Sequence, residues 1–189
     1  MTIFHWIISA LWLLFVLYWA VAAMSAKRTV KTAAWWGQAA LRVFIIVLAI
    51  AAYRMPAVRH AVTIAQATAR GTAWGAAGAI LVGLGIGLAI VARAYLGRNW
   101  GTPMSQKENP ELVTGGPYGV IRHPIYSGIV LAMFGSMLGL SLFWFLPLVL
   151  FSAYFIYSAR REEALMCRQF PGQYPAYMKR TKMIVPFLL

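Results

Sequence analysis

The residues able to do acid, base or ion-pair chemistry gather in two short stretches, residues 93–122 and 160–182. The sequence has no aspartate, and all of its carboxylate side chains fall within these stretches: Glu108, Glu111, Glu162 and Glu163. These four glutamates are the candidates for a general acid, a general base or the partner of a bound cation. We therefore expect the chemistry of this protein in its C-terminal half.

The first stretch ends in an Arg-His-Pro block. Pro124 suits the first turn of a helix, where its missing N–H breaks no hydrogen bond. Arg122 and His123 would then stand at the positively polarised start of that helix, beside backbone N–H groups without intrahelical partners. Such a position suits a carboxylate or a phosphate. On spacing alone, a second interpretation is equally favoured. In it, Arg122 reaches lipid phosphate, and Tyr118 and Tyr126 are interfacial aromatics.

The second stretch opens with two arginines and two glutamates at the end of an apolar segment. Adjacent helical residues point about 100° apart, so one of Glu162 and Glu163 can face the interior while the other faces solvent or an arginine. A carboxylate near the C-terminal end of a helix is disfavoured by the helix dipole, which indicates a cationic partner. That partner is either Arg160 or Arg161 in a surface ion pair, or the ammonium group of a ligand.

The composition indicates that the bilayer is the solvent of this protein. Of its 189 residues, 61% are hydrophobic and 11% are charged, which is too apolar for an ordinary soluble domain. The net charge of +13 is not concentrated in a hydrophilic basic domain, so anionic lipid headgroups are a simpler partner than nucleic acid. Cys167 is the only cysteine, which excludes an intrachain disulfide.

The elements that must position these residues are predicted to be membrane helices. The expected fold is an all-α polytopic bundle of about five transmembrane helices without a Rossmann domain. The predicted spans are about 3–24, 35–53, 73–95, and two helices within 126–158 that form a hairpin with a break near Gly139 to Leu142. Residues 1–95 would hold the first three spans and an interfacial segment near 55–70, and residues 96–189 the catalytic region.

Two further features of the predicted spans concern helix packing. Gly83 and Gly87 form a small-xxx-small pair, which would let a neighbouring helix approach closely. No strand precedes these glycines, so packing is favoured over nucleotide binding. Pro147 is expected to be tolerated inside the last span or to kink it. Arg42 is the one clear charge within a span, and its role stays open.

The distribution of lysine and arginine predicts the topology. With five spans, one side of the membrane collects Lys27, Arg28, Lys31, Arg93, Arg98, Lys107, Arg122, Arg160, Arg161, Arg168, Lys179, Arg180 and Lys182. The other side has only Arg54, Arg59 and Arg70. The positive-inside rule then places the N-terminus outside and both polar stretches in the cytoplasm, in an integral membrane protein of the bacterial inner membrane type.

The motifs together resemble a known enzyme family. They are Gly97 to Trp100, Glu111 to Tyr118, Arg122 to Gly128, the pair Glu162 and Glu163, and Phe170 to Tyr177 with Arg180, Thr181 and Pro186. In this order and spacing they resemble the isoprenylcysteine carboxyl methyltransferase family and the related phospholipid methyltransferases. The resemblance covers roughly residues 93–189. The chain is similar to a short, prokaryotic-type member, and residues 101–110 depart from the family pattern.

The resemblance implies an S-adenosylmethionine-dependent methyltransferase that needs no metal. By analogy the cofactor site includes Tyr118, Arg122, His123, Pro124, Tyr126, Gly128, Glu162, Glu163, Tyr174 and Tyr177, and the catalytic residues are Arg122, Glu163 and Arg98. The cofactor calls for a cationic donor for its carboxylate, an anion for its ammonium and an electron-rich wall for its sulfonium. Which glutamate meets the cofactor stays open.

The methyl acceptor implied by the resemblance is lipophilic. A prenylcysteine-type carboxylate is the main expectation; it would arrive already anionic, so that Arg98 or Arg122 need only orient it. The alternative is N-methylation of a phosphatidylethanolamine-type phospholipid, for which a glutamate or His123 must take a proton. A further alternative is a non-catalytic membrane scaffold that retains the pocket.

Overall fold

The computed structural model describes residues 3–24, 54–67, 71–100 and 111–184, with isolated positions at 40, 47 and 51. Its helices are α1 (Ile3–Ala23), α3 (Pro56–Ala67), α4 (Thr72–Leu96), α5 (Pro124–Gly139), α6 (Phe145–Gln169) and α7 (Gln173–Arg180), with 3-10 turns at Gly97–Asn99, Gly116–Gly119 and Leu142–Trp144. These residues form no β-sheet. The predicted all-α class without a Rossmann domain is confirmed for the described part of the chain.

Three of these helices are long and apolar enough to cross a membrane. They are α1, α4 with its following turn (Thr72–Asn99), and α6 with its preceding turn (Leu142–Gln169). The fourth apolar helix, α5, has 16 residues, which at a rise of about 1.5 Å per residue is shorter than a hydrocarbon core of about 30 Å. The predicted span at 35–53 lies largely outside the described residues, so the expected five full spans are confirmed only in part.

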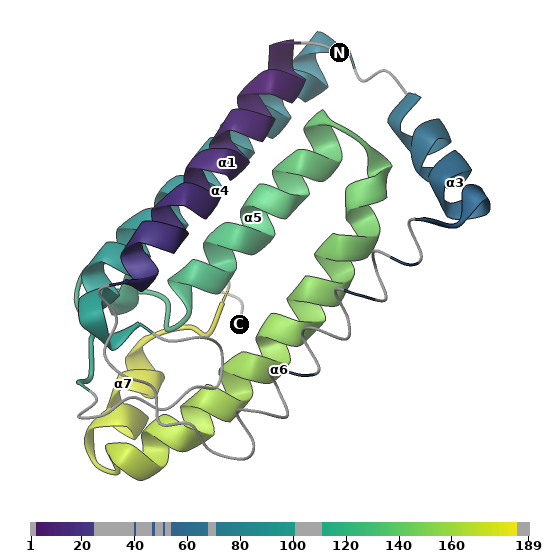
Figure 1. The fold of residues 1–189 in the computed structure, drawn as a ribbon. Helices are drawn as coiled ribbons and strands as arrows, with labels where there is room; N and C mark the ends of the chain where they lie inside the picture. Colours follow the sequence, from purple (N-terminus) through teal and green to yellow (C-terminus); the bar gives the residue numbers. More distant parts are fainter. Residues whose placement is uncertain are drawn as a thin grey trace.

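The helices α1, α4 and α5 pack side by side, and α6 returns antiparallel to α5 (Figure 1). The predicted break of the hairpin is confirmed, since α5 ends at Gly139 and the next turn begins at Leu142. The hydroxyl of Ser141 accepts a hydrogen bond from the backbone N–H of Phe143 and so caps this turn. Pro147 is the third residue of α6, where its N–H is not required by the helix.

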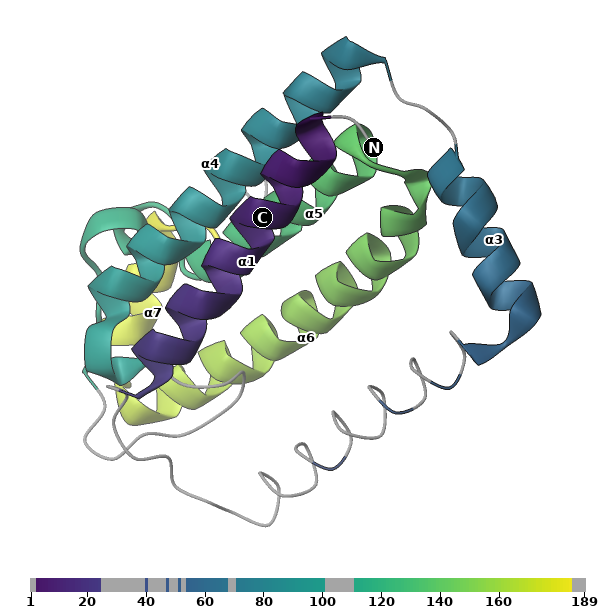
Figure 2. The ribbon, with the colours of Figure 1, turned by 45° about the horizontal axis from the view of Figure 1, so that its top comes forward.

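Glycines bring α4 and α5 into backbone contact, and Figure 2 shows these two helices running along each other behind α1. A Cβ on Gly78 would lie 2.5 Å from the Cα of Gly139, and one on Gly85 would lie 2.6 Å from the backbone nitrogen of Ala132. Among the described residues, nothing lies within 4 Å of such a Cβ on Gly83 or on Gly87. The glycines of α4 that let α5 approach are therefore Gly78 and Gly85, not the predicted pair.

Helix α4 packs against α5 through the face on which buried residues recur every three to four positions. Gly78, Val82 and Gly85 are buried on this face, followed by Ile86 and Ala89. Gly83 is five residues after Gly78, so it points to a different side of the helix. The sequence period alone does not show which glycines meet a partner, because the position of α5 decides it.

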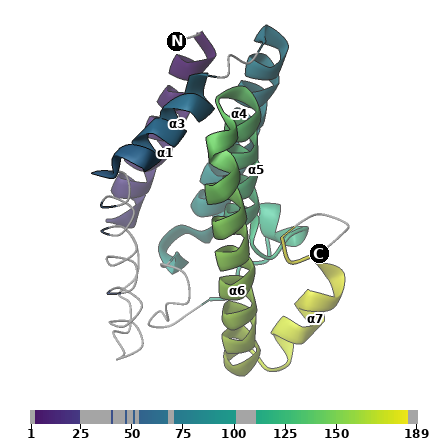
Figure 3. The ribbon, with the colours of Figure 1, turned by 90° about the vertical axis from the view of Figure 1, so that its right-hand side faces the viewer.

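Helix α3 lies at the end of the bundle opposite α7 (Figure 3). The predicted helix near residues 55–70 is confirmed in its helical form, and it contacts the turn between α5 and α6. His60 is exposed on α3, as is Arg59. The cytoplasmic topology predicted above places this end of the bundle on the outer side.

At the α7 end, a buried arginine joins α1 to α4. Arg93 is 2% exposed and donates to the backbone carbonyls of Ala22, at 2.5 Å, and Gly97, at 2.6 Å. Its guanidinium also lies over the ring of Trp100, 4.8 Å from the centroid. One side chain thus donates to carbonyls at the C-terminal ends of two helices, where the α-helical pattern leaves carbonyls without donors. The backbone of Gly97 has a φ of +53°, a left-handed conformation that ends α4 at this residue.

Candidate functional site

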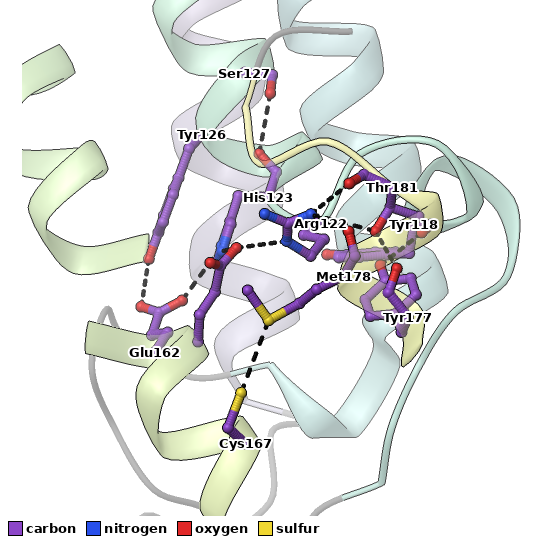
Figure 4. Close-up of polar contacts among 11 residues, drawn as sticks. Tyr118, Arg122, His123, Tyr126, Ser127, Glu162, Cys167, Tyr177, Met178 and Thr181 are labelled. Atoms are coloured by element: carbon purple, nitrogen blue, oxygen red, sulfur yellow. Dashed lines mark hydrogen bonds and ion pairs between the residues drawn. The ribbon is translucent and has the colours of Figure 1, made fainter. Parts of the chain in front are cut away.

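The candidate site lies where α5 begins and α6 nears its end, with α7 packed against α6 and the segment after α7 against the start of α5; Figure 4 shows its side chains. Arg122 is its central cation. Its Nε donates to Oε1 of Glu163 at 2.6 Å, and each of the two side chains is 9% exposed. Its Nη1 donates to the backbone carbonyls of Thr181, at 2.5 Å, and Met178, at 3.2 Å. The guanidinium is therefore held in one orientation by acceptors from two other elements.

The backbone around Arg122 is fixed by the C-terminal tail. Ile121 and Lys182 form an isolated parallel bridge. The backbone N–H of Arg122 donates to the carbonyl of Lys182 at 2.8 Å, and that of His123 donates to the carbonyl of Met183 at 3.0 Å. The tail thus satisfies two N–H groups just ahead of α5, a helix that Pro124 opens at its first position as predicted.

His123 stands between the two glutamates. Its Nε2 lies 3.3 Å from Oε1 of Glu163, and its Nδ1 lies 3.6 Å from Oε2 of Glu162. The Glu162 side chain is 25% exposed, while those of His123 and Glu163 are each 9% exposed. Of the two glutamates, Glu163 is thus the one that faces the interior, while Glu162 is partly exposed, and both side chains contact the same imidazole ring.

Aromatic rings extend the cluster into the apolar part of the bundle. The hydroxyl of Tyr126 donates to Oε1 of Glu162 at 2.6 Å. The ring of Tyr126 is parallel to that of His123, with centroids 5.4 Å apart, and to that of Phe155, with centroids 4.5 Å apart. Three flat rings, from the residue that precedes α5, from α5 and from α6, are thus stacked on one side of the cluster.

The tyrosines of α7 and of the turn before α5 form the other side. The hydroxyl of Tyr177 donates to the backbone carbonyl of Tyr118 at 2.6 Å. Burial raises the pKa of Tyr177 to about 12, and burial raises the pKa of Tyr118 well above its usual value. Burial and then the Glu163 carboxylate likewise raise the pKa of Tyr174. All three phenols are therefore neutral near pH 7 and can donate hydrogen bonds.

The structure brings together most of the predicted site residues, with two that stand apart. Arg98 is exposed on the turn after α4, and among the described residues no contact joins it to Arg122 or Glu163. Gly128 is buried, but it packs against the backbone of Gly85 and Ala89 in α4. Helix packing accounts for Gly128 without a ligand.

The sequence did not reveal which groups hold Arg122, or that Arg93 donates to carbonyls at the ends of two helices. Arg122 is oriented by backbone carbonyls of residues 178 and 181, and any residue type supplies a carbonyl. Arg93 counted only as a topology marker, although a basic residue in the last turn of an apolar helix is a signal for capping carbonyls. A third missed residue is Ser158, whose buried hydroxyl lacks a hydrogen-bond partner within the described part of the chain. It lies one turn before Glu162 on α6.

Residues 74–173 match the family model described as phospholipid methyltransferase, which is more than half of the chain. The chain belongs to the phospholipid methyltransferase family. Members of this family are S-adenosylmethionine-dependent methyltransferases. A comparison with curated proteins gave no match.

The matched segment contains the whole charged cluster and stops before the tyrosines of α7. It includes Arg122, His123, Glu162 and Glu163. The match supports the broad group that the motifs resemble, and the type that it names is the phospholipid one. It gives no specific support for the isoprenylcysteine type.

Proposed function

We propose that this protein is an integral membrane methyltransferase that uses S-adenosylmethionine to methylate the amino headgroup of a phospholipid. One observation carries the proposal: the segment that matches the family, residues 74–173, encloses a buried cluster of Arg122, His123 and two glutamates at one end of an apolar helix bundle. The family's named function favours a phospholipid acceptor over the prenylcysteine carboxylate that we expected first.

The chemistry of the donor set fits the amino-acid end of the cofactor. Within the described residues, Arg122 makes its contacts through Nε and Nη1, and we assign Nη2 to the carboxylate of the cofactor. Glu162 and Glu163 supply the negative charge that an ammonium group requires. With the imidazole neutral, Arg122 and the two glutamates sum to one negative charge, which favours a cationic ligand.

The remaining predicted residues have supporting places around this position. Tyr126, stacked between His123 and Phe155, orients the Glu162 carboxylate through its hydroxyl, which donates to Oε1 at 2.6 Å. Tyr118, Tyr174 and Tyr177 close the side formed by α7, and Pro124 sets the start of α5. When bound, S-adenosylmethionine supplies the electrophilic methyl group. The protein's own contribution is to align the acceptor with that group and to exclude water.

A calorimetric titration of the purified protein with S-adenosylhomocysteine tests the cofactor site. We expect saturable binding that is lost in Arg122→Ala and retained in Arg161→Ala, an exposed arginine of α6 that serves as the matched control. Equal affinity in both variants would contradict the placement of the cofactor at Arg122.

Transfer of a labelled methyl group then tests the acceptor. We expect label in the headgroup when the protein is supplied with phosphatidylethanolamine, and none in a prenylcysteine analogue. Label in the prenylcysteine analogue alone would favour O-methylation, with Arg98 or Arg122 orienting the carboxylate. Saturable cofactor binding without methyl transfer to either acceptor, or to a total lipid extract, would favour a non-catalytic scaffold.

We also propose that the cluster faces the cytoplasm, where the soluble cofactor is made. The ends of α1 and α4 meet at Arg93, and the polar ends of α5 and α6 meet at Arg122, so the polar stretches share one end of the bundle. A reporter enzyme fused to the C-terminus should be active only as a cytoplasmic reporter. Activity on the opposite side would reverse this orientation.

A further inference from the structure

Among the described residues, the imidazole of His123 has a carboxylate near each of its two ring nitrogens. Nε2 faces Glu163 and Nδ1 faces Glu162, at 3.3 Å and 3.6 Å. Ionised carboxylates only accept hydrogen bonds, so a neutral ring can donate to one of them and presents a bare nitrogen to the other. Uptake of a proton at that nitrogen completes the second contact.

The two sides of the ring differ in their access to solvent. Glu163 is 9% exposed and is tied to Arg122, whereas Glu162 is 25% exposed. A proton that enters at Nε2 and leaves from Nδ1 therefore moves from the buried side of the cluster towards water. Imidazole is the side chain that exchanges protons most readily near neutral pH, and the stacked ring of Tyr126 keeps it in the required plane.

Methylation of an amine creates a need for such a path, whereas methylation of a carboxylate does not. A headgroup arrives as an ammonium and must lose one proton before its nitrogen has a lone pair. That lone pair forms the N–C bond while the S–C bond of the sulfonium breaks and its electron pair stays on sulfur. One proton is released for each methyl group transferred, and a carboxylate acceptor would release none.

We propose that His123 is a catalytic proton relay for amine methylation, taking the proton of the acceptor ammonium at Nε2 and passing a proton from Nδ1 to Glu162. This inference rests on the proposed function. The ionisable groups that face the ring are Arg122 beside it in the chain, Glu162 and Glu163 from α6, Tyr126 from α5, and Tyr174 from α7 near Glu163.

The test compares His123→Ala with His60→Gln, a control substitution at an exposed histidine of α3. With phosphatidylethanolamine as acceptor, we expect kcat of His123→Ala to fall by about 100-fold, which is the usual scale for loss of a general base. The affinity for S-adenosylhomocysteine should stay within about threefold, since the relay acts on the acceptor proton. His60→Gln should match the unchanged protein in both measurements.

Two readouts separate a relay from a structural role. Added imidazole should restore the kcat of His123→Ala in proportion to its concentration. The variant should also gain rate by about tenfold per pH unit as the headgroup amine loses its proton to solvent, while the unchanged protein is nearly level over that range. Joint loss of cofactor affinity and thermal stability, with no rescue by imidazole, would overturn the relay.

Glu162→Gln provides a second variant in case His123→Ala does not fold. It removes the proton acceptor on the exposed side, and we expect about a tenfold lower kcat at saturating cofactor. An unchanged kcat in Glu162→Gln would contradict this exit path. A pH-indicator assay of the unchanged protein keeps the two proposals apart: methyl transfer to the lipid without one proton per methyl group would refute amine methylation itself, whereas proton release with insensitive variants would refute only the relay.

Discussion

The α4 and α5 pair and the α5 and α6 pair are joined by opposite kinds of contact. Between α4 and α5, glycines such as Gly78 and Gly85 let backbone touch backbone along the apolar length of the helices. Where α5 begins and α6 ends, Arg122, His123 and two glutamates form charged contacts. Close packing is effective in lipid because small residues lose little side-chain conformational entropy when helices associate. Buried charges, in contrast, are stable only when each has a partner of opposite charge. The first contact sets a spacing, and the second builds a site.

Breaking the charged contact should have the largest effect on stability. Arg122→Met removes the arginine partner of Glu163 and leaves a buried carboxylate that, among the described residues, has only His123 as a partner, so we expect a loss of about 3–5 kcal/mol in the free energy of unfolding. The measurement is denaturant unfolding in detergent, followed by circular dichroism. The double variant Arg122→Met with Glu163→Met should recover much of this stability without recovering cofactor binding.

Breaking the glycine contact should have the next largest effect. Gly85→Val places side-chain atoms where Gly128 and Ala132 of α5 now lie, and we expect a loss of about 3 kcal/mol from overpacking. Gly83→Val is the matched control, because a Cβ there meets nothing within 4 Å. Equal thermal stability of the two variants would mean that α4 presents a different face to α5.

Removing the arginine that joins α1 to α4 should have a smaller effect. Arg93→Met keeps an apolar side chain over Trp100 but leaves the carbonyls of Ala22 and Gly97 without this donor, and we expect a loss of about 2 kcal/mol. Limited proteolysis between α1 and α4 should become faster. Arg98→Met, at an exposed position, should leave the proteolysis rate unchanged and so serves as the control for stability.

The smallest expected effect concerns the aromatic side of the charged cluster. Tyr177→Phe removes the hydrogen bond to the carbonyl of Tyr118 while keeping the ring, and we expect a loss of about 1 kcal/mol. Thermal unfolding at pH 7 checks this, because a pKa of about 12 keeps the Tyr177 hydroxyl protonated there. A loss as large as that of Arg122→Met would show that α7 carries more of the stability of the cluster than its charges do.

The sequence predicted the parts of the site that depend on residue type. Pro124 marks the start of α5, and the rarity of carboxylates pointed to Glu162 and Glu163. It did not predict that the C-terminal tail pairs with residues 120–123, because backbone hydrogen bonds leave no trace in residue type. It also selected the wrong glycines of α4. The face that packs is decided by the glycines of a partner helix about 50 residues away in the chain.

The bridge between Ile121 and Lys182 also bears on how the protein is made. Four apolar helices of the described chain precede the tail, so they can enter the membrane while the ribosome is still at work. Arg122 meets its carbonyl partners at residues 178 and 181 only after that segment has left the ribosome. A chain that lacks this segment therefore contains its apolar helices and the side chains of Arg122 and Glu163, but no carbonyl acceptors that hold the guanidinium in its orientation.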